Sequence, residues 1–165
     1  MKKQLVTWTD VEHQVQEILR QMQRDNWLPD YVVGLTRGGL VPANMISQYL
    51  YIPMHTLKVS LRDDSNPPES NLWMAEDAYG YEEGNVVNVR KNILVVDDIN
   101  DTGKTINWLI DDWQSSCRPH DPVWKDVWNN NVKFAAVYDN VVYQGGLTYT
   151  AHPISLAAAI ANIKV

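Results

Sequence analysis

The sequence predicts a single α/β domain over residues 1–165, with a mostly parallel central sheet between helices in three layers. Short β-branched runs, YVVGL, NILVV and VKFAAVYD, alternate along the chain with stretches of helical periodicity. Strands that alternate with helices favour parallel pairing, with helices on both faces of the sheet. A length of 165 residues suits one domain with a sizeable core.

The first predicted helix covers residues 9–23. Thr9 and Glu12 have the spacing of a capping box, which favours a helix start at this point. Apolar residues recur at helical intervals and predict one buried stripe, at Val11, Val15, Ile18, Leu19 and Met22. The sequence NWLPD then ends the helix.

The other predicted elements follow the same alternation. Strands are expected at residues 31–35, 54–62, 92–96 and 132–139, and helices at 40–50 and 105–116. Residues 63–88 are different, because they hold two adjacent prolines, several acids and the sequence YGYEEGN. So long an excursion in a compact domain is usually a functional lid or a disordered segment, so we expect a hood or flexible loop at about 61–90.

The composition limits the possible partners. A formal charge of −6 argues against nucleic acid and anionic membranes, so any phosphorylated ligand needs a local positive field. The single cysteine, Cys117, excludes an internal disulfide and fits a reducing cytoplasm, where we expect the protein to be. The first ten residues lack the apolar region of a signal peptide, and no apolar run is long enough to span a bilayer.

The stretch ILVVDDINDTGKT, residues 93–105, ends like a nucleotide-binding P-loop. A P-loop also needs a glycine five residues before the second one, so that the backbone can curl around phosphates. Asp98 holds that position and Asp97 precedes it, and two adjacent carboxylates would repel a polyphosphate. The sequence therefore does not favour a P-loop.

The same stretch makes chemical sense when it is divided into two parts. Asp97 and Asp98 end a strand, where they can accept hydrogen bonds from a sugar diol or hold a divalent cation through water. The residues DTGKT then turn into a helix, and their backbone amides and hydroxyl groups suit an anion. Gly103 permits the tight backbone geometry of that turn. Together the two parts predict a site for a ribose 5-phosphate.

At this point the sequence resembles a known family. VVDDINDTGKT is similar to the signature of type I phosphoribosyltransferases, and VGLTRGGLVPANMIS resembles the pyrophosphate-binding turn of the same family. The resemblance is closest to the xanthine-guanine and hypoxanthine-guanine purine branch. It implies transfer of a phosphoribosyl group from 5-phosphoribosyl-1-pyrophosphate to a purine-like base, with Mg²⁺, in purine salvage. It also implies a homodimer or homotetramer that binds small-molecule substrates.

The resemblance implies a role for each motif residue. Asp97 and Asp98 would hold the ribose hydroxyls and Mg²⁺, the latter through water, and Asp101 would be the catalytic acid/base; its alternative role is an N-cap. The implied 5-phosphate site comprises Asp101, Thr102, Gly103, Lys104 and Thr105. The implied pyrophosphate turn comprises Thr36, Arg37, Gly38 and Gly39, and in the family this turn often contains a non-proline cis peptide. Lys58 and Arg62 either reach the pyrophosphate or belong to a solvated face.

The sequence departs from the family at the base-binding end. Purine-using members carry a lysine just after the strand that corresponds to FAAVYD, whereas here Asn140 is near that place and no lysine is close by. The tail at about 141–165 also does not resemble the family tail. Asn140 and Tyr138 are the predicted base-binding residues. A second interpretation is therefore a regulatory protein that binds the donor or a nucleotide without catalysis.

Overall fold

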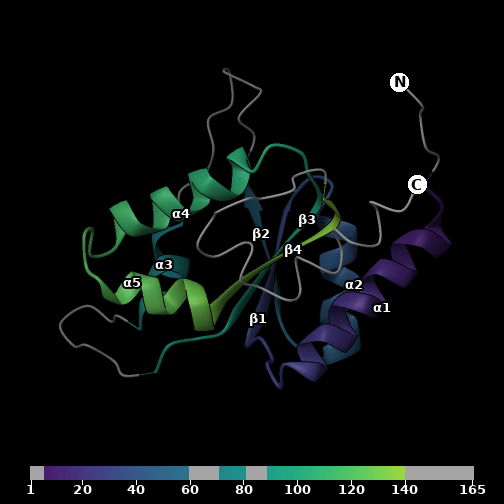
Figure 1. Ribbon diagram of the computed structural model, residues 1–165, viewed down its shortest axis with the longest axis horizontal. Helices are drawn as coiled ribbons and strands as arrows, with labels where there is room; N and C mark the ends of the chain where they lie inside the picture. The colour runs from purple at the N-terminus through teal and green to yellow at the C-terminus, as the bar shows by residue number, and fades with distance from the viewer. Residues whose placement is uncertain (1–5, 60–70, 81–88, 140–165) are drawn as a thin grey trace.

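A computed structural model describes residues 6–59, 71–80 and 89–139 of the chain (Figure 1). Its helices are α1 (Trp8–Arg24), α2 (Leu40–Leu50), α3 (Leu72–Tyr79), α4 (Lys104–Ser116) and α5 (Val123–Asp126), followed by a π-helical turn at Val127–Asn131. Its strands are β1 (Tyr31–Thr36), β2 (Met54–Lys58), β3 (Ile93–Asn100) and β4 (Val132–Asp139). All four predicted strands and all three predicted helices are therefore present.

The four strands form one parallel sheet in the order β2-β1-β3-β4. The strands β1 and β3 lie in the middle, and Gly34 of β1 pairs in register with Val96 of β3. The strand β3 is longer than predicted, since it continues past Asp97 and Asp98 to Asn100. This extension carries the acid pair on the sheet itself rather than on the loop after it.

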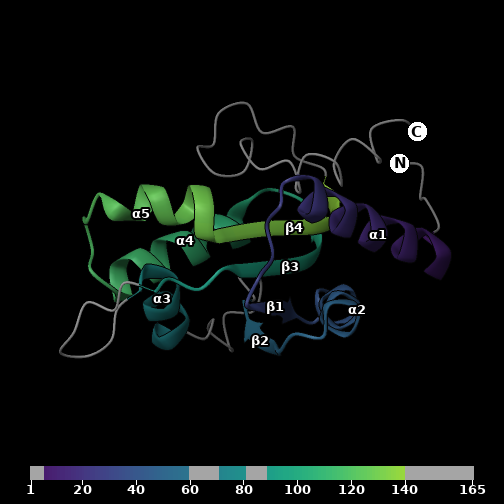
Figure 2. The ribbon, with the colours of Figure 1, turned by 90° about the horizontal axis from the view of Figure 1, so that it is seen from below.

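Helices cover both faces of the sheet, as the sequence predicts. The helices α1 and α2 pack on one face, where Ile18 and Ile46 join the strand residues Leu94 and Val96 in a buried cluster. The helices α3, α4 and α5 pack on the other face, against alternate strand residues such as Val95. Figure 2 shows these two groups of helices on opposite sides of the strands. The three-layer α/β prediction is confirmed.

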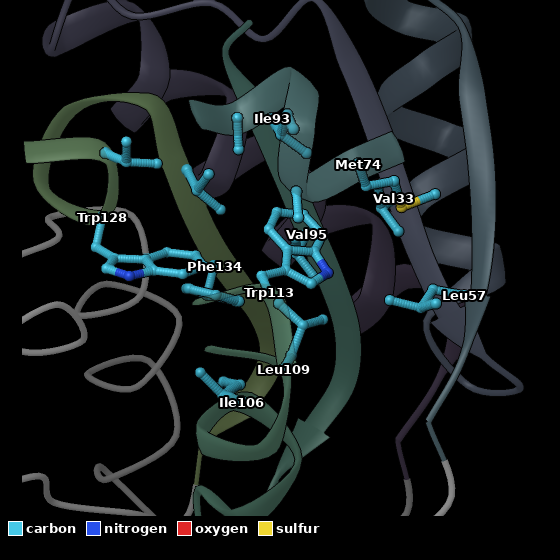
Figure 3. Packing of buried hydrophobic residues seen from close by; sticks show 14 of the residues in the cluster. Val33, Leu57, Met74, Ile93, Val95, Ile106, Leu109, Trp113, Trp128 and Phe134 are labelled. Atoms are coloured by element: carbon cyan, nitrogen blue, oxygen red, sulfur yellow. The ribbon is translucent and has the colours of Figure 1, made fainter. Parts of the chain in front are cut away.

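Aromatic side chains fill much of the second face. Trp113 of α4 stacks on Trp128 with ring centroids 5.9 Å apart, and Trp128 in turn stacks on Phe134 of β4 (Figure 3). Trp124 stacks on Trp128 from the α5 side, at 5.2 Å. This packing holds α4 against the π-helical turn and, through Trp128, against β4.

The start of α1 lies two residues earlier than the capping-box spacing predicts. Thr7 is the N-cap, its hydroxyl accepts a hydrogen bond from the Asp10 amide at 3.2 Å, and the Asp10 carboxylate accepts one from the Thr7 amide at 2.8 Å. The helix then begins at Trp8. The pairs Thr7–Asp10 and Thr9–Glu12 both have capping-box spacing, so the spacing alone does not show which threonine is the N-cap.

The predicted hood at about 61–90 contains a helix that the sequence does not reveal. The helix α3 occupies its middle, and Met74, Ala75 and Ala78 are buried in the core against α4. This part of the segment is therefore a structural layer. Residues 60–70 and 81–88, and the tail from 140 onward, lie outside the described residues.

Candidate functional site

The predicted site residues gather at the carboxyl ends of the two central strands. The strand β1 ends at Thr36 and leads through a tight turn into α2, which begins at Leu40. The strand β3 ends at Asn100 and leads through a second turn into α4, which begins at Lys104. In open parallel sheets ligands bind in the crevice at these strand ends.

The first turn brings the backbone of α2 directly onto the sheet. The peptide bond between Thr36 and Arg37 is cis, as the family resemblance implies for this turn. Gly39 is the N-cap of α2, and its amide donates to the Leu35 carbonyl at 2.9 Å. A Cβ added at Gly39 would overlap the carbonyl oxygen of Val96 and lie 2.8 Å from that of Leu35. Only glycine fits at this position.

Gly38 joins the first turn to the acid pair. A Cβ added at Gly38 would overlap the carboxyl group of Asp98, so the backbone of the turn lies against that carboxylate. Sixty positions separate the two residues in the sequence, and the pairing of β1 with β3 brings them together. The turn and the acid pair therefore belong to one site.

The two carboxylates of the acid pair lie in different surroundings. Asp98 is exposed, whereas Asp97 is partly buried and its Oδ1 accepts a hydrogen bond from the Asp98 amide at 2.9 Å. Burial, a side-chain hydrogen bond with Asp98 and the Asp98 charge together raise the pKa of Asp97 to about 7, while the hydrogen bond from the Asp98 amide acts in the opposite direction. Asp97 thus holds a proton near neutral pH until a cation or another partner favours its charged form.

Asp97→Asn is expected to stabilise the protein at alkaline pH. Because the pKa of Asp97 is raised from 3.8 to about 7, the folded protein binds this proton more tightly than the unfolded chain. The resulting contribution to stability is complete below pH 3.8 and is lost as the pH rises through 7. The asparagine variant has no such loss, so its advantage in unfolding free energy should grow between pH 5 and pH 8, toward an upper bound of about 4 kcal/mol. Urea unfolding at both pH values measures this. An advantage independent of pH would contradict the assigned cause.

Asn100 holds the second turn, between β3 and α4, in place through a hydrogen bond. This residue is 5% exposed, and its Oδ1 accepts a hydrogen bond from the Gly103 amide at 3.0 Å. Gly103 has φ 73° and ψ −4°, in the left-handed region that favours glycine, and it is the N-cap of α4. Asp101 is therefore not the N-cap of α4.

The side chains of this turn face outward. Asp101, Thr102 and Lys104 are exposed and Thr105 is partly exposed, while Gly103 is buried beneath them. The first amides of α4 have no partner within the helix, and the positive end of its dipole lies at this turn. The turn thus carries hydroxyl groups, helix amides and a lysine, which are the kinds of group that bind anions at the start of a helix.

A groove of about 530 Å³ lies elsewhere, between α1 and α2. Leu19, Trp27 and Tyr49 are among its lining residues, and these side chains precede the amino ends of β1 and β2. None of the predicted site residues lines it. Among the residues that the structure describes, no helix is long and apolar enough to cross a membrane.

Comparison with known proteins decides the family. The family model described as the phosphoribosyl transferase domain matches residues 1–144. The chain belongs to this family.

Relatives of this phosphoribosyl transferase domain share modest identity with it. A xanthine-guanine phosphoribosyltransferase of Idiomarina loihiensis is 29% identical over 105 residues, which cover 63% of this chain and 60% of that protein. A hypoxanthine-guanine phosphoribosyltransferase of Saccharomyces cerevisiae is 26% identical over 125 residues, which cover 66% of this chain and 53% of that protein. The chain thus matches little more than half the length of these curated relatives.

Solved structures of the family have the same fold. The purine phosphoribosyltransferase of Pyrococcus horikoshii superposes with a TM-score of 0.55 at 22% identity, over 84% of this chain and 79% of that one. The fold is therefore that of the phosphoribosyl transferase domain, as the sequence resemblance implies.

Within this phosphoribosyl transferase domain, Lys58 lies beside the first turn. It is the last residue of β2 and pairs in register with Thr36. Register partners on neighbouring strands project to the same face, so Lys58 and Thr36 lie on one side of the sheet edge. The structure thus brings Lys58 to the turn, while Arg62 lies outside the described residues.

Only one of the two predicted base-binding residues lies in the described part of the chain. Asn140 lies outside the described residues, whereas Tyr138 of β4 is partly buried and pairs in register with Ile99 of β3. Burial raises the pKa of Tyr138, and the charge of Asp10 adds to this. Ile99 is an apolar side chain with 45% of its surface exposed, next to Asp98 in the sequence. The sequence analysis does not single out Ile99, although an exposed apolar residue beside an acid pair at a strand end is unusual.

Proposed function

We propose that this chain is a phosphoribosyltransferase. It transfers the ribose 5-phosphate group of 5-phosphoribosyl-1-pyrophosphate to a nitrogen of a purine-like base and releases pyrophosphate. The observation that carries the proposal is the contact of Gly38 with the Asp98 carboxyl group, which joins an anion-binding turn to a carboxylate pair. The names of the relatives, xanthine-guanine and hypoxanthine-guanine phosphoribosyltransferase, support a purine-like acceptor.

Each part of 5-phosphoribosyl-1-pyrophosphate can be assigned to one group of residues at the strand ends. Asp97 and Asp98 accept hydrogen bonds from the two ribose hydroxyls. The groups assigned to the 5-phosphate are the backbone and side chains of Asp101, Thr102, Lys104 and Thr105, with Gly103 shaping the turn. The groups assigned to the pyrophosphate are Thr36, Arg37, Gly38 and Gly39, with Lys58 beside them. In this proposal, catalysis comes mainly from two effects: the protein positions both reactants, and it stabilises the negative charge on the departing pyrophosphate.

The oxygen ligands that Asp97 and Asp98 supply fit Mg²⁺. Adjacent carboxylates supply the oxygen ligands that this ion prefers, and Mg²⁺ sites commonly combine one or two carboxylates with water and substrate phosphates. Among the described residues no group of three or more acidic, histidine or cysteine side chains could hold a metal. In this proposal, water and the phosphates of 5-phosphoribosyl-1-pyrophosphate supply the remaining ligands. When bound, Mg²⁺ offsets the negative charge of the pyrophosphate. Asp97 and Asp98 would hold it through water.

Asp101 is the proposed catalytic residue. It is exposed at the tip of the second turn, between the acid pair and α4, where it can face a base bound above the ribose. It exchanges a proton with the ring nitrogen of the base. Ile99 and Tyr138 supply apolar surface for the ring, and Asn140 supplies an amide for its polar edge.

A second candidate function is a sensor that binds the donor or a nucleotide without catalysis. It is favoured by the base-binding end, where neither lysine nor arginine occurs from residue 134 to residue 163. For either function we propose a cytoplasmic homodimer or homotetramer.

Two measurements separate the candidates. Both predict Mg²⁺-dependent binding of 5-phosphoribosyl-1-pyrophosphate in isothermal titration. The transferase alone predicts a nucleotide product when guanine, hypoxanthine, xanthine or adenine is added to the loaded protein. Binding without product from any of the four bases would favour the sensor, and no binding of the donor would overturn both.

Gly38→Ala is expected to weaken donor binding by about tenfold to a hundredfold. The added methyl group occupies the place of the Asp98 carboxyl group, which must rotate away from the ribose. Because Asp98 is exposed, this rotation costs little stability, and the thermal midpoint should shift by no more than about 4 °C. Isothermal titration with the donor measures the affinity.

The neighbouring glycine supplies the control. In Gly39→Ala the methyl group meets the backbone oxygen of Val96, which cannot rotate away, so this variant should lose about 1–3 kcal/mol of stability. Unchanged donor affinity in Gly38→Ala, with its fold intact, would contradict the shared site.

A further inference from the structure

We infer that Asn100 is a positioning residue that sets the geometry of the phosphate turn. The inference rests on the proposed function, because it concerns how the 5-phosphate end of that site is built. Asn100 is among the few buried polar residues of the described chain, and it is the last residue of β3. Its pairing with Asp139 of β4 holds it in the sheet, so its position is fixed before the turn begins.

The contact of Asn100 with Gly103 determines which amides face the ligand. The Gly103 amide donates to Asn100 Oδ1 at 3.0 Å, inside the protein, so this N–H points away from the anion. Gly103 is buried, and its amide would lose water without gaining a partner if Asn100 had no acceptor there. The carbonyl of Gly103 meanwhile accepts from the Asn107 amide at 2.9 Å, which starts α4.

This arrangement assigns the phosphate to the amides that follow Gly103. The amides of Lys104 and Thr105 belong to the first turn of α4, where N–H groups have no partner within the helix. With the Gly103 amide turned inward, the next peptide groups present their N–H outward at the dipole end of α4. Asn100 therefore links the rigid sheet to the anion site without touching the ligand.

The first test measures amide hydrogen exchange of the ligand-free protein by NMR. In the wild type the Gly103 amide should exchange at least about a hundredfold more slowly than an unprotected amide. In Asn100→Leu, which keeps the side-chain size and removes the acceptor, the Gly103 amide should exchange at least about tenfold faster than in the wild type. The amides of Leu109 and Trp113 in the same helix should keep their protection. In Asn100→Asp, which retains an acceptor oxygen, the Gly103 amide should remain protected.

The second test separates this inference from the proposed function. Asn100→Leu should weaken binding of ribose 5-phosphate by about tenfold or more and leave binding of inorganic pyrophosphate within about twofold. A loss of both ligands would indicate general damage and overturn the positioning role. An unprotected Gly103 amide in the wild type would overturn it without any variant, even if Asn100→Leu does not fold. Failure of the wild type to bind ribose 5-phosphate at all would instead contradict the proposed function.

Discussion

Asp101→Asn is expected to lower the rate of nucleotide formation by about 10²–10⁴-fold and to change donor affinity much less. The amide has the shape of the carboxyl group but cannot take up and return a proton at neutral pH. Because Gly103 rather than Asp101 is the N-cap of α4, the substitution does not remove the helix N-cap. Single-turnover kinetics gives the rate, and isothermal titration gives the affinity for the donor.

Asp111→Asn is the matched control for this variant. Asp111 is exposed on α4, two turns beyond the site, and the same loss of one negative charge there should leave the rate within about twofold. Equal losses of rate and donor affinity in Asp101→Asn would show that Asp101 serves binding rather than proton transfer.

Gly103→Val is expected to abolish donor binding, which corresponds to a loss of at least about a hundredfold in affinity. Gly103 has φ 73°, and a β-branched residue is strongly disfavoured in this left-handed conformation. Relief of that strain moves the turn, and with it the Asn100 contact and the first amides of α4. Titration with the donor at the highest accessible protein concentration measures the loss.

Gly80→Val is the control that separates the effect of backbone strain on stability from the loss of donor binding. Gly80 also has a left-handed backbone, with φ 78°, but it is the C-cap of α3 and lies outside the predicted site. Both variants should lose stability, and only Gly103→Val should lose the donor. Retained affinity in Gly103→Val, or an equal loss in Gly80→Val, would count against the phosphate turn.

The strands and three helices were predictable because their signals are local. β-branched runs predicted β1, β3 and β4, the alternation of apolar and polar residues predicted β2, and apolar residues at helical intervals predicted the buried stripe of α1. The helix α3 could not be predicted in the same way. It has only eight residues, and it is held by burial of residues such as Ala75 and Ala78 against α4, which lies far away in the sequence. The surrounding prolines and acids also favoured a loop.

For the candidate site, the sequence could predict the types of group it contains but not the contacts between them. The residue types at positions 97–105 indicated a sugar diol and an anion, because carboxylates and a glycine-containing turn have those chemical preferences wherever they occur. Three features depend on the folded structure: the contact of Gly38 with Asp98, the raised pKa of Asp97, and the inward hydrogen bond of the Gly103 amide. Each arises from burial or from a neighbour that the sheet supplies. The sequence motif alone assigns Gly103 a direct phosphate contact, and the inward hydrogen bond of its amide leads us to propose a conformational role for it.

The central claim is that one site holds the ribose hydroxyls at the acid pair and the terminal phosphate at the turn that follows it. An NMR titration of the free protein with ribose 5-phosphate tests this most directly, with 2-deoxyribose 5-phosphate as the comparison. We expect the amides of Asp98 and Thr105 to shift along one saturation curve with ribose 5-phosphate. With the deoxy sugar we expect weaker binding, by about tenfold, and little shift at Asp98. Shifts at Thr105 with none at Asp98, or equal affinity for the two sugars, would contradict the claim.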